Sequence, residues 1–169
     1  MNGGGDAEVE YTRIVHTIPP VFNSESEILI LGSLPSVKSR ENNFFYGHPQ
    51  NRFWKVIAAL AGSFVPETIE GKKKLLIENR IALWDVIAEC DIIGSSDSSI
   101  KNVVPNNLEV ILETANIEKI FANGSTAYRP VSYTHLMKRF LIKGNRLIFR
   151  RKKALKCLKR GAWLLIILM

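Results

Sequence analysis

The sequence predicts an α/β fold, a three-layer sandwich around a central, mostly parallel sheet. Two apolar runs, at residues 27–32 and 117–124, end in glycine, and such runs are typical of buried strands that stop at functional turns. Segments with helical periodicity lie between these runs, and strands that alternate with helices favour a parallel sheet. The length of 169 residues and a hydrophobic content of 46% indicate one domain with a full core and exclude global disorder.

Local signals place the predicted elements along the chain. Residues 33–50 have no clear period and are rich in Pro, Ser, Asn and Gly, so we expect a long loop, and long ordered loops are usually functional. Asn51 is a candidate N-cap for a helix over 52–61, which Gly62 ends. The other predicted elements are a helix over 67–80, a strand or buried segment over 81–87, a loop over 91–102, a short helix capped by Asn106 or Asn107 and ending at Thr114, and a helix starting at 125.

The net charge of +7 is unevenly distributed along the chain. Residues 1–130 contain 12 Lys and Arg against 16 Asp and Glu, whereas residues 131–169 contain 11 Lys and Arg and no acidic residue. Because the basic excess lies entirely in the second segment, the net charge is weak support for nucleic-acid binding by the domain as a whole. We expect residues 1–11 to form a flexible leader.

Composition also limits the class of protein. No apolar run approaches the roughly 20 residues that span a bilayer, and the acidic, glycine-rich start is unlike a secretory signal, so we expect no membrane partner. Two distant cysteines, Cys90 and Cys157, fit a reducing compartment, so we expect a cytoplasmic protein. No cluster of His, Cys and carboxylate residues indicates a metal, and we expect no cofactor.

The loop after the first predicted strand carries residue types that suit a flat heterocycle. Phe44, Phe45 and Tyr46 are consecutive aromatics, followed by His48 and several amides. Aromatic rings stack on a base while amides read its polar edge. Basic and hydroxyl side chains of the same loop, with nearby backbone N–H groups, suit phosphates, and the predicted phosphate-binding set is Ser36, Lys38, Ser39 and Arg40.

This loop resembles the first motif of the uracil-DNA glycosylase superfamily, and in detail its hypoxanthine (deoxyinosine) DNA glycosylase branch. The resemblance lies in GSLPSVKS at 32–39 and FFYGHPQNRFWKV at 44–56, and mismatch-specific uracil glycosylases share much of this pattern. Further matches are LWDV at 83–86, GSSDSSI at 94–100 and IFANGSTAY at 120–128, so the resemblance covers about residues 14–129. It implies a uracil-DNA glycosylase-like sandwich and a hydrolase of N-glycosyl bonds.

The resemblance assigns roles to residues of the loop. Asn51 is the first catalytic candidate, since its amide is able to orient a water or hold the leaving base; the alternative is that it only caps a helix. His48 is the second, for stabilising the departing base or the sugar cation, with a structural hydrogen bond as the alternative. Tyr46 lies where related enzymes stack an aromatic on the flipped base; the alternative is that Phe44, Phe45 and Tyr46 all serve core or hinge packing. Strict alternation puts Phe44 beside Tyr46 in the base pocket and Phe45 in the core.

The implied base pocket also includes Ser33, Leu34 and Gly47. Classical uracil enzymes carry Asp or Asn at the position of Leu34 to activate water, so leucine there argues for the hypoxanthine branch. No lysine of the motif is placed to form a Schiff base, because Lys38 is better placed for a phosphate. The expected enzyme is therefore monofunctional: it flips the nucleotide, stretches the N-glycosidic bond and lets a positioned water complete hydrolysis.

The C-terminal part departs from the family pattern. Members carry a second, Ser/Pro/Asn-rich motif that grips DNA, and residues 131–169 contain none. We therefore expect a truncated domain over 12–130, incomplete at its C-terminus, and a basic tail that is foreign or frameshifted. The alternatives are a genuine tail that strengthens DNA binding through phosphates and a basic amphipathic helix for membranes or partners.

The predicted partner is double-stranded DNA that contains a deaminated base, either hypoxanthine or uracil, bound by a monomer. The alternative function is an inactive, truncated glycosylase that acts as a nucleic-acid-binding fragment. An unrelated nucleotide-binding protein is disfavoured, because neither a P-loop nor a G-x-G-x-x-G motif occurs in the sequence.

Overall fold

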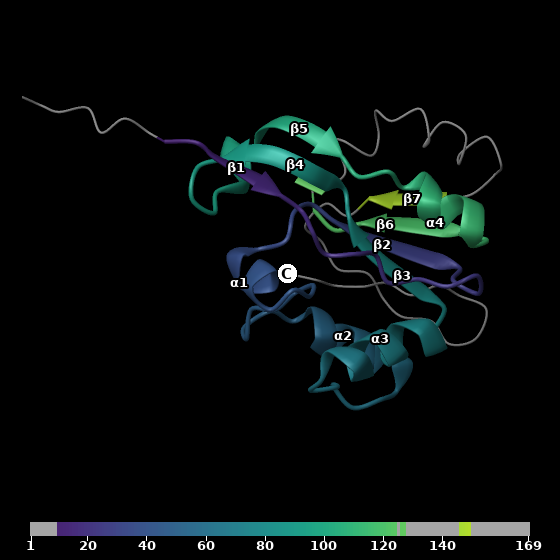
Figure 1. Cartoon of the computed structure of the whole chain (residues 1–169). Helices are drawn as coiled ribbons and strands as arrows, with labels where there is room; N and C mark the ends of the chain where they lie inside the picture. The colour runs from purple at the N-terminus through teal and green to yellow at the C-terminus, as the bar shows by residue number, and fades with distance from the viewer. Residues whose placement is uncertain (1–9, 125, 128–145, 150–169) are drawn as a thin grey trace, which may run out of the picture.

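A four-stranded parallel sheet forms the centre of the molecule (Figure 1). The computed structural model describes residues 10–124, 126–127 and 146–149. The strand order of the parallel sheet is β3 (Ile81–Asp85), β2 (Ile28–Gly32), β6 (Lys119–Ala122) and β7 (Arg146–Phe149). Each neighbouring pair is parallel, which confirms the predicted α/β class with a mostly parallel central sheet.

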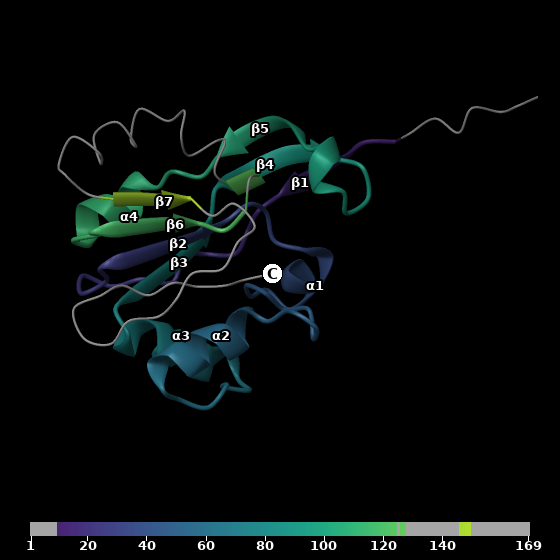
Figure 2. The same ribbon diagram turned by 180° about the vertical axis from the view of Figure 1, so that it is seen from behind.

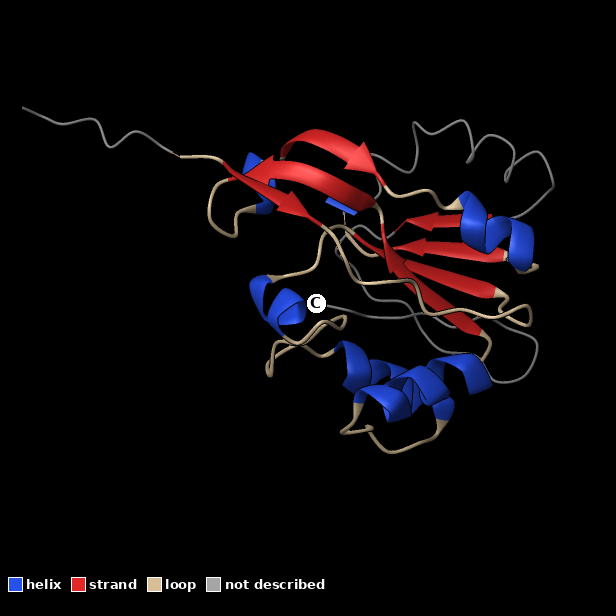
Figure 3. Cartoon of the chain, viewed as in Figure 1, coloured by secondary structure: helices blue, strands red, loops and turns tan. Residues whose placement is uncertain are grey.

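The strand β2 lies inside this sheet, between β3 and β6, and its residues Leu29, Ile30 and Leu31 are fully buried. An apolar run without alternation is what a strand covered on both faces requires. Helices α2 (Phe53–Ala61) and α3 (Ile69–Glu78) lie together on one side of the sheet, as Figures 2 and 3 show. The short helix α4 (Glu109–Thr114) buries Ile111 in the hydrophobic core that also contains the buried residues of β2.

A second, antiparallel sheet was not predicted. It contains β1 (Thr12–Val15), β4 (Ile87–Ile92) and β5 (Lys101–Pro105) in the order β1-β4-β5. The predicted loop over 91–102 is thus partly wrong: β4 extends into it, a 3₁₀ turn at Asp97–Ser99 follows, and β5 begins at its end. All five residues of β5 are exposed, so this edge strand carries no burial pattern that sequence periodicity would reveal.

The helix boundaries differ from the predicted ones by one or two residues, as helix ends usually do. A short helix α1 (Val37–Glu41), which Ser36 caps, interrupts the predicted loop over 33–50. Helix α2 starts one residue later than expected, and its N-cap position is Arg52 rather than Asn51. Thr68 caps α3 through its hydroxyl, which accepts a hydrogen bond from the backbone N–H of Gly71 at 3.0 Å.

Strand β7 lies within the segment predicted to be a foreign or frameshifted tail. It pairs with β6 in parallel register from Lys119↔Arg146 to Ala122↔Phe149. The rest of residues 131–169, and residues 1–9 of the predicted leader, lie outside the described part of the chain. Among the described residues, no helix is long and apolar enough to cross a membrane.

Candidate active site

A small hollow opens at the carboxyl ends of the parallel strands β2 and β3. It encloses about 90 Å³. Ligands in open α/β sheets bind beyond the carboxyl ends of the strands, so its position agrees with the expected place of a site. The residues that line it come from the segment between β2 and α2, which includes α1, and from the end of β3: Leu34, Pro35, Ser36, Ser39, Phe45, Tyr46, Asn51 and Asp85.

The last residues of the two strands, Gly32 and Asp85, are direct neighbours in the parallel register. A Cβ atom on Gly32 would lie 2.0 Å from Asp85 Oδ1 and 3.3 Å from the hydroxyl oxygen of Tyr46. The Asp85 carboxylate therefore lies over the Gly32 backbone. Glycine ends β2 because no other residue leaves space for this carboxylate.

Asp85 is paired with His16, which follows β1. His16 Nε2 is 3.1 Å from Asp85 Oδ2, and both side chains are buried, with 1% and 6% exposure. The backbone N–H of Ile18 donates to His16 Nδ1 at 3.2 Å. Because that nitrogen accepts, Nε2 carries the proton of a neutral imidazole and donates it to the carboxylate. Burial raises the pKa of Asp85 above its ordinary value, and the hydrogen bond from His16 opposes this shift.

Tyr46 is held from three directions. Its backbone adopts the left-handed region, with φ of 52°. Its ring stacks on Phe53 with a centroid separation of 3.8 Å, and its hydroxyl oxygen accepts a hydrogen bond from Asn123 Nδ2 at 3.0 Å. Burial, followed by the Asp85 charge, raises the pKa of the Tyr46 hydroxyl, while the Asn123 hydrogen bond lowers it. The phenol therefore stays protonated at neutral pH.

Of the two aromatic residues before Tyr46, Phe45 is a buried core residue as predicted, whereas Phe44 does not lie where it was predicted. Phe45 lines the hollow, whereas Phe44 packs on Trp54 at 5.6 Å and lines a separate depression that includes Lys73. The structure thus places Phe44 away from the predicted base pocket. Strict alternation fails because the segment is a turn, with positive φ at Asn43 and Tyr46, and not a strand.

The two catalytic candidates occupy different environments. Asn51 lines the hollow, and its Oδ1 accepts a hydrogen bond from the backbone N–H of Phe53 at 2.8 Å. Its side chain thus supports the start of α2 while its amide Nδ2 remains a donor. His48 is exposed and does not line the hollow, and its Nδ1 accepts a hydrogen bond from the Gln50 N–H at 3.2 Å.

The predicted phosphate-binding residues have partners within the protein. Ser36 and Ser39 line the hollow, with their hydroxyl oxygens 3.0 Å apart, and Ser39 Oγ accepts the N–H of Gly47 at 3.0 Å. Lys38 forms an exposed ion pair with Glu41 at 2.7 Å. Arg40, finally, donates from Nη1 to the carbonyl oxygen of Pro35 at 2.7 Å.

Two residues of the predicted base pocket lie beside the hollow without lining it. The carbonyl oxygen of Ser33 accepts the N–H of Ile87, which joins β2 to β4. A Cβ on Gly47 would lie 2.9 Å from both Asn42 Nδ2 and the Lys38 carbonyl oxygen, so glycine at this position permits a close backbone contact with α1. Leu34 does line the hollow, and it packs against a small hydrophobic cluster formed by Ile87, Cys90 and Ile92 of β4.

Sequence reasoning missed Asp85, His16 and Asn123. Asp85 had a usable signal, because it is an acidic residue at the end of an otherwise apolar strand, where ligands bind in parallel sheets. His16 had none, since its partner lies 69 positions away. Among the described residues, no group of three His, Cys, Asp or Glu is arranged to hold a metal ion.

Comparisons with known proteins agree with this geometry. The family model described as "Uracil DNA glycosylase superfamily" matches residues 19–166. Proteins named hypoxanthine DNA glycosylase from Methanosarcina barkeri and Methanosarcina acetivorans are 34% and 38% identical over 117 residues, which is 67% of this chain and 74% of each relative. A solution NMR structure from M. acetivorans, of a candidate uracil DNA glycosylase, gives a TM-score of 0.64 at 34% identity, covering 77% of this chain and 78% of that one.

The chain therefore belongs to the uracil DNA glycosylase superfamily. The resemblance expected from the loop motif is confirmed, and so is the enzyme class, a DNA glycosylase that hydrolyses N-glycosyl bonds.

Proposed function

We propose that this chain removes a deaminated base, hypoxanthine or uracil, from double-stranded DNA as a monofunctional glycosylase. The observation that carries the proposal is the hollow beyond β2 and β3, where Tyr46, Asn51 and Asp85 meet in a chain related to proteins named hypoxanthine DNA glycosylase. A base inside a duplex is out of reach of such a hollow, so the target nucleotide must be flipped out of the stack.

Two side chains suit a deaminated base. Phe53 covers one face of the Tyr46 ring, and the other face is the natural stacking platform for the flipped base. Deamination replaces an exocyclic amino donor by a carbonyl acceptor. The Asn51 amide Nδ2 is a donor, and it therefore matches hypoxanthine or uracil better than adenine or cytosine.

The chemistry of the lining residues supports hydrolysis by water. No lysine is among the described residues that line the hollow, so no amine is placed to form a Schiff base with the sugar. We expect the product to be an intact abasic site. The rate enhancement comes from orienting the flipped nucleotide and from stabilising charge as the base departs.

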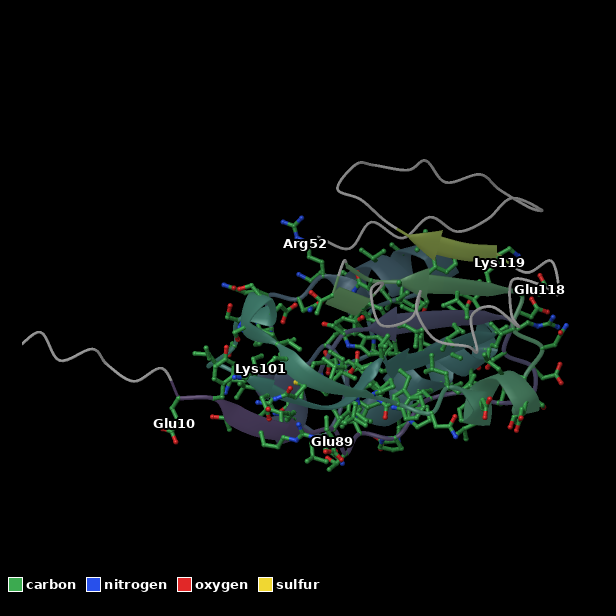
Figure 4. All side chains as sticks on the ribbon, turned by 90° about the horizontal axis from the view of Figure 1, so that it is seen from above. Glu10, Arg52, Glu89, Lys101, Glu118 and Lys119 are labelled. Atoms are coloured by element: carbon green, nitrogen blue, oxygen red, sulfur yellow. The ribbon has the colours of Figure 1, made fainter. Side chains whose placement is uncertain are left out.

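The DNA strand passes the mouth of the hollow. Arg52 follows Asn51 directly and projects away from the body of the molecule, as Figure 4 shows. We assign a phosphate contact to Arg52, since Lys38 and Arg40 are engaged by Glu41 and by a backbone carbonyl.

An end-labelled duplex with a single deoxyinosine tests this function. After incubation with the protein, hot alkali should cleave the strand at that position, and a matched duplex with deoxyadenosine should stay intact. Cleavage without alkali would contradict the monofunctional mechanism. Binding without base release from either deoxyinosine or deoxyuridine would contradict the glycosylase and favour the nucleic-acid-binding fragment.

A further inference from the structure

We propose that Asp85 is the catalytic carboxylate that takes the proton from the attacking water, and that His16 is the positioning residue that holds it ready. This inference rests on the proposed glycosylase function and deepens it. It assigns a proton acceptor to the hollow, because none of the lining residues between β2 and α2, Leu34 included, is a carboxylate.

The composition of the hollow identifies Asp85. Among its described lining residues, Asp85 carries the one carboxyl group. The hydroxyls of Ser36 and Ser39 are neutral and hydrogen-bonded to each other, and Tyr46 is held as a neutral phenol by burial. A water that attacks the sugar needs a group that accepts its proton, and Asp85 has the chemistry for this.

The two oxygens of the Asp85 carboxylate have different environments. Oδ2 faces His16 Nε2, while Oδ1 lies over the Gly32 backbone, next to the Tyr46 hydroxyl. Among the described residues, Oδ1 has no hydrogen-bond partner, although the Tyr46 hydroxyl lies nearby. A carboxylate that is buried almost completely yet has an unsatisfied oxygen at the edge of a hollow is costly, and this arrangement is typical of functional sites.

His16 fixes both the orientation and the charge of Asp85. Since the Ile18 N–H occupies Nδ1, the imidazole presents Nε2–H to the carboxylate and favours its ionised form. The titratable groups that face Asp85 in the described chain are His16 from the segment after β1 and Tyr46 from the loop before α2. Gly32 of β2 lies against the carboxylate, and Asn106 donates from Nδ2 to the backbone carbonyl of Asp85 at 2.9 Å; neither residue titrates.

The water oxygen forms a bond to C1′ of the flipped nucleotide, and the C1′–N bond breaks with its electron pair on the base. The proton from water passes to Asp85 Oδ1. The base leaves as an anion and takes up a proton from solvent, and Asp85 returns its proton to solvent before the next turnover.

Variants of His16 separate positioning from packing. His16→Gln keeps a donor near the place of Nε2 and so still serves Asp85. His16→Asn keeps an acceptor for the Ile18 N–H but lacks the donor to Asp85. Asp85→Asn removes the proton acceptor and keeps the shape, and Asp91→Asn, on the outer face of β4 beside Arg13, is the matched control.

Single-turnover base release from the deoxyinosine duplex is measured between pH 5 and pH 9, with circular dichroism confirming that each variant is folded. We expect Asp85→Asn to be slower by about 10²-fold or more, and Asp91→Asn to match the wild type. His16→Asn should move the acidic limb of the pH profile to higher pH, because Asp85 loses the hydrogen bond that favours its ionised form. Below that limb, the rate should be about tenfold lower for each unit by which the Asp85 pKa rises. His16→Gln should restore most of the wild-type profile.

The outcomes keep the two proposals apart. If the wild-type protein releases the base and folded Asp85→Asn does so at the wild-type rate, the role of Asp85 is wrong while the glycosylase function stands. If His16→Asn and His16→Gln lose activity equally without a change in the pH profile, His16 is only a packing residue. If the wild-type protein releases no base, the proposed function is wrong and this inference is wrong with it.

Discussion

The indole Nε1–H of Trp84 donates a hydrogen bond to the carbonyl oxygen of Ile18 across 3.1 Å. Nearby, Val21 and Leu83 exchange two backbone hydrogen bonds, at 2.8 and 3.0 Å. The segment that carries His16 is therefore attached to β3, the strand that carries Asp85. The two members of the buried pair are positioned by one local set of contacts, although they are far apart in the sequence.

Trp84→Phe should weaken this attachment. Phenylalanine keeps most of the buried ring but cannot donate, so the Ile18 carbonyl loses its partner, at a cost of about 1 kcal/mol in the free energy of unfolding. We expect a lower rate of base release, and we expect the acidic limb of its pH profile to have its midpoint at a higher pH. Urea unfolding and the pH profile together check this. Unchanged profiles in a destabilised Trp84→Phe would show that the hydrogen bond has only a structural role.

Asp85→Asn should make the folded protein more stable at neutral pH while it lowers activity. Burial raises the folded-state pKa of Asp85 above its unfolded value of about 3.9, so the ionised carboxylate is penalised in the fold. That penalty is absent below the unfolded pKa and complete above the folded pKa. The gain in Tm of Asp85→Asn over the wild type should therefore grow as pH rises from about 4 and should vanish in acid.

Asp91→Asn should shift Tm at neutral pH in the opposite direction. Hydrogen bonds from Asn102 and Arg13 lower the pKa of Asp91, so this partly exposed carboxylate contributes a little stability above its unfolded pKa and loses it as pH falls. Asp91→Asn should thus lower Tm slightly at neutral pH. A Tm at neutral pH that falls in Asp85→Asn as it does in Asp91→Asn would contradict the assignment of Asp85 as a penalised charge.

Tyr46→Leu and Tyr46→Phe should separate stacking from hydrogen bonding. Leucine removes the ring that we expect to stack on the flipped base, a contact worth about 1–3 kcal/mol, so KM should rise. Phenylalanine keeps the ring on Phe53 and loses only the hydroxyl contact with Asn123. Steady-state kinetics on the deoxyinosine duplex should therefore rank Tyr46→Phe close to the wild type. Equal losses in both variants would contradict a stacking role.

Arg52→Gln should weaken DNA binding without a preference for the base. Removal of one phosphate contact lowers the slope of log K against log salt by about one unit. Lys74→Gln is the matched control, since Lys74 lies on α3 and is exposed beside Glu78. Fluorescence anisotropy over a range of salt concentrations gives both slopes. An Arg52→Gln slope equal to that of Lys74→Gln would exclude the assigned contact.

The sequence was sufficient for the parts of the fold with a strong local pattern. The apolar run of β2 and the amphipathic pattern of α2 each identify an element without reference to distant residues. Strands β1 and β5 escaped prediction because they are exposed edge strands, and they are defined by pairing with β4 rather than by burial. Pairing depends on the rest of the chain and leaves no local trace.

The same division holds for the site. Tyr46 and Asn51 belong to one continuous motif and were predicted as site residues, and both line the hollow. Phe44 was misplaced because the left-handed backbone at Tyr46 turns the chain, which no side-chain pattern indicates. His16 escaped because its partner, Asp85, lies 69 positions away in the sequence, whereas Asp85 was overlooked although it ends an otherwise apolar strand.

Because Gly32 and Asp85 are in contact, the residues at the ends of β2 and β3 cannot be substituted independently of each other. A side chain at position 32 and a carboxylate at position 85 compete for the same space, so a change at either position alters what the other tolerates. Gly32→Ala should be severely damaging in the wild type but much milder when Asp85 is also replaced by glycine. Engineering of the base pocket in this chain therefore has to vary positions 32 and 85 together.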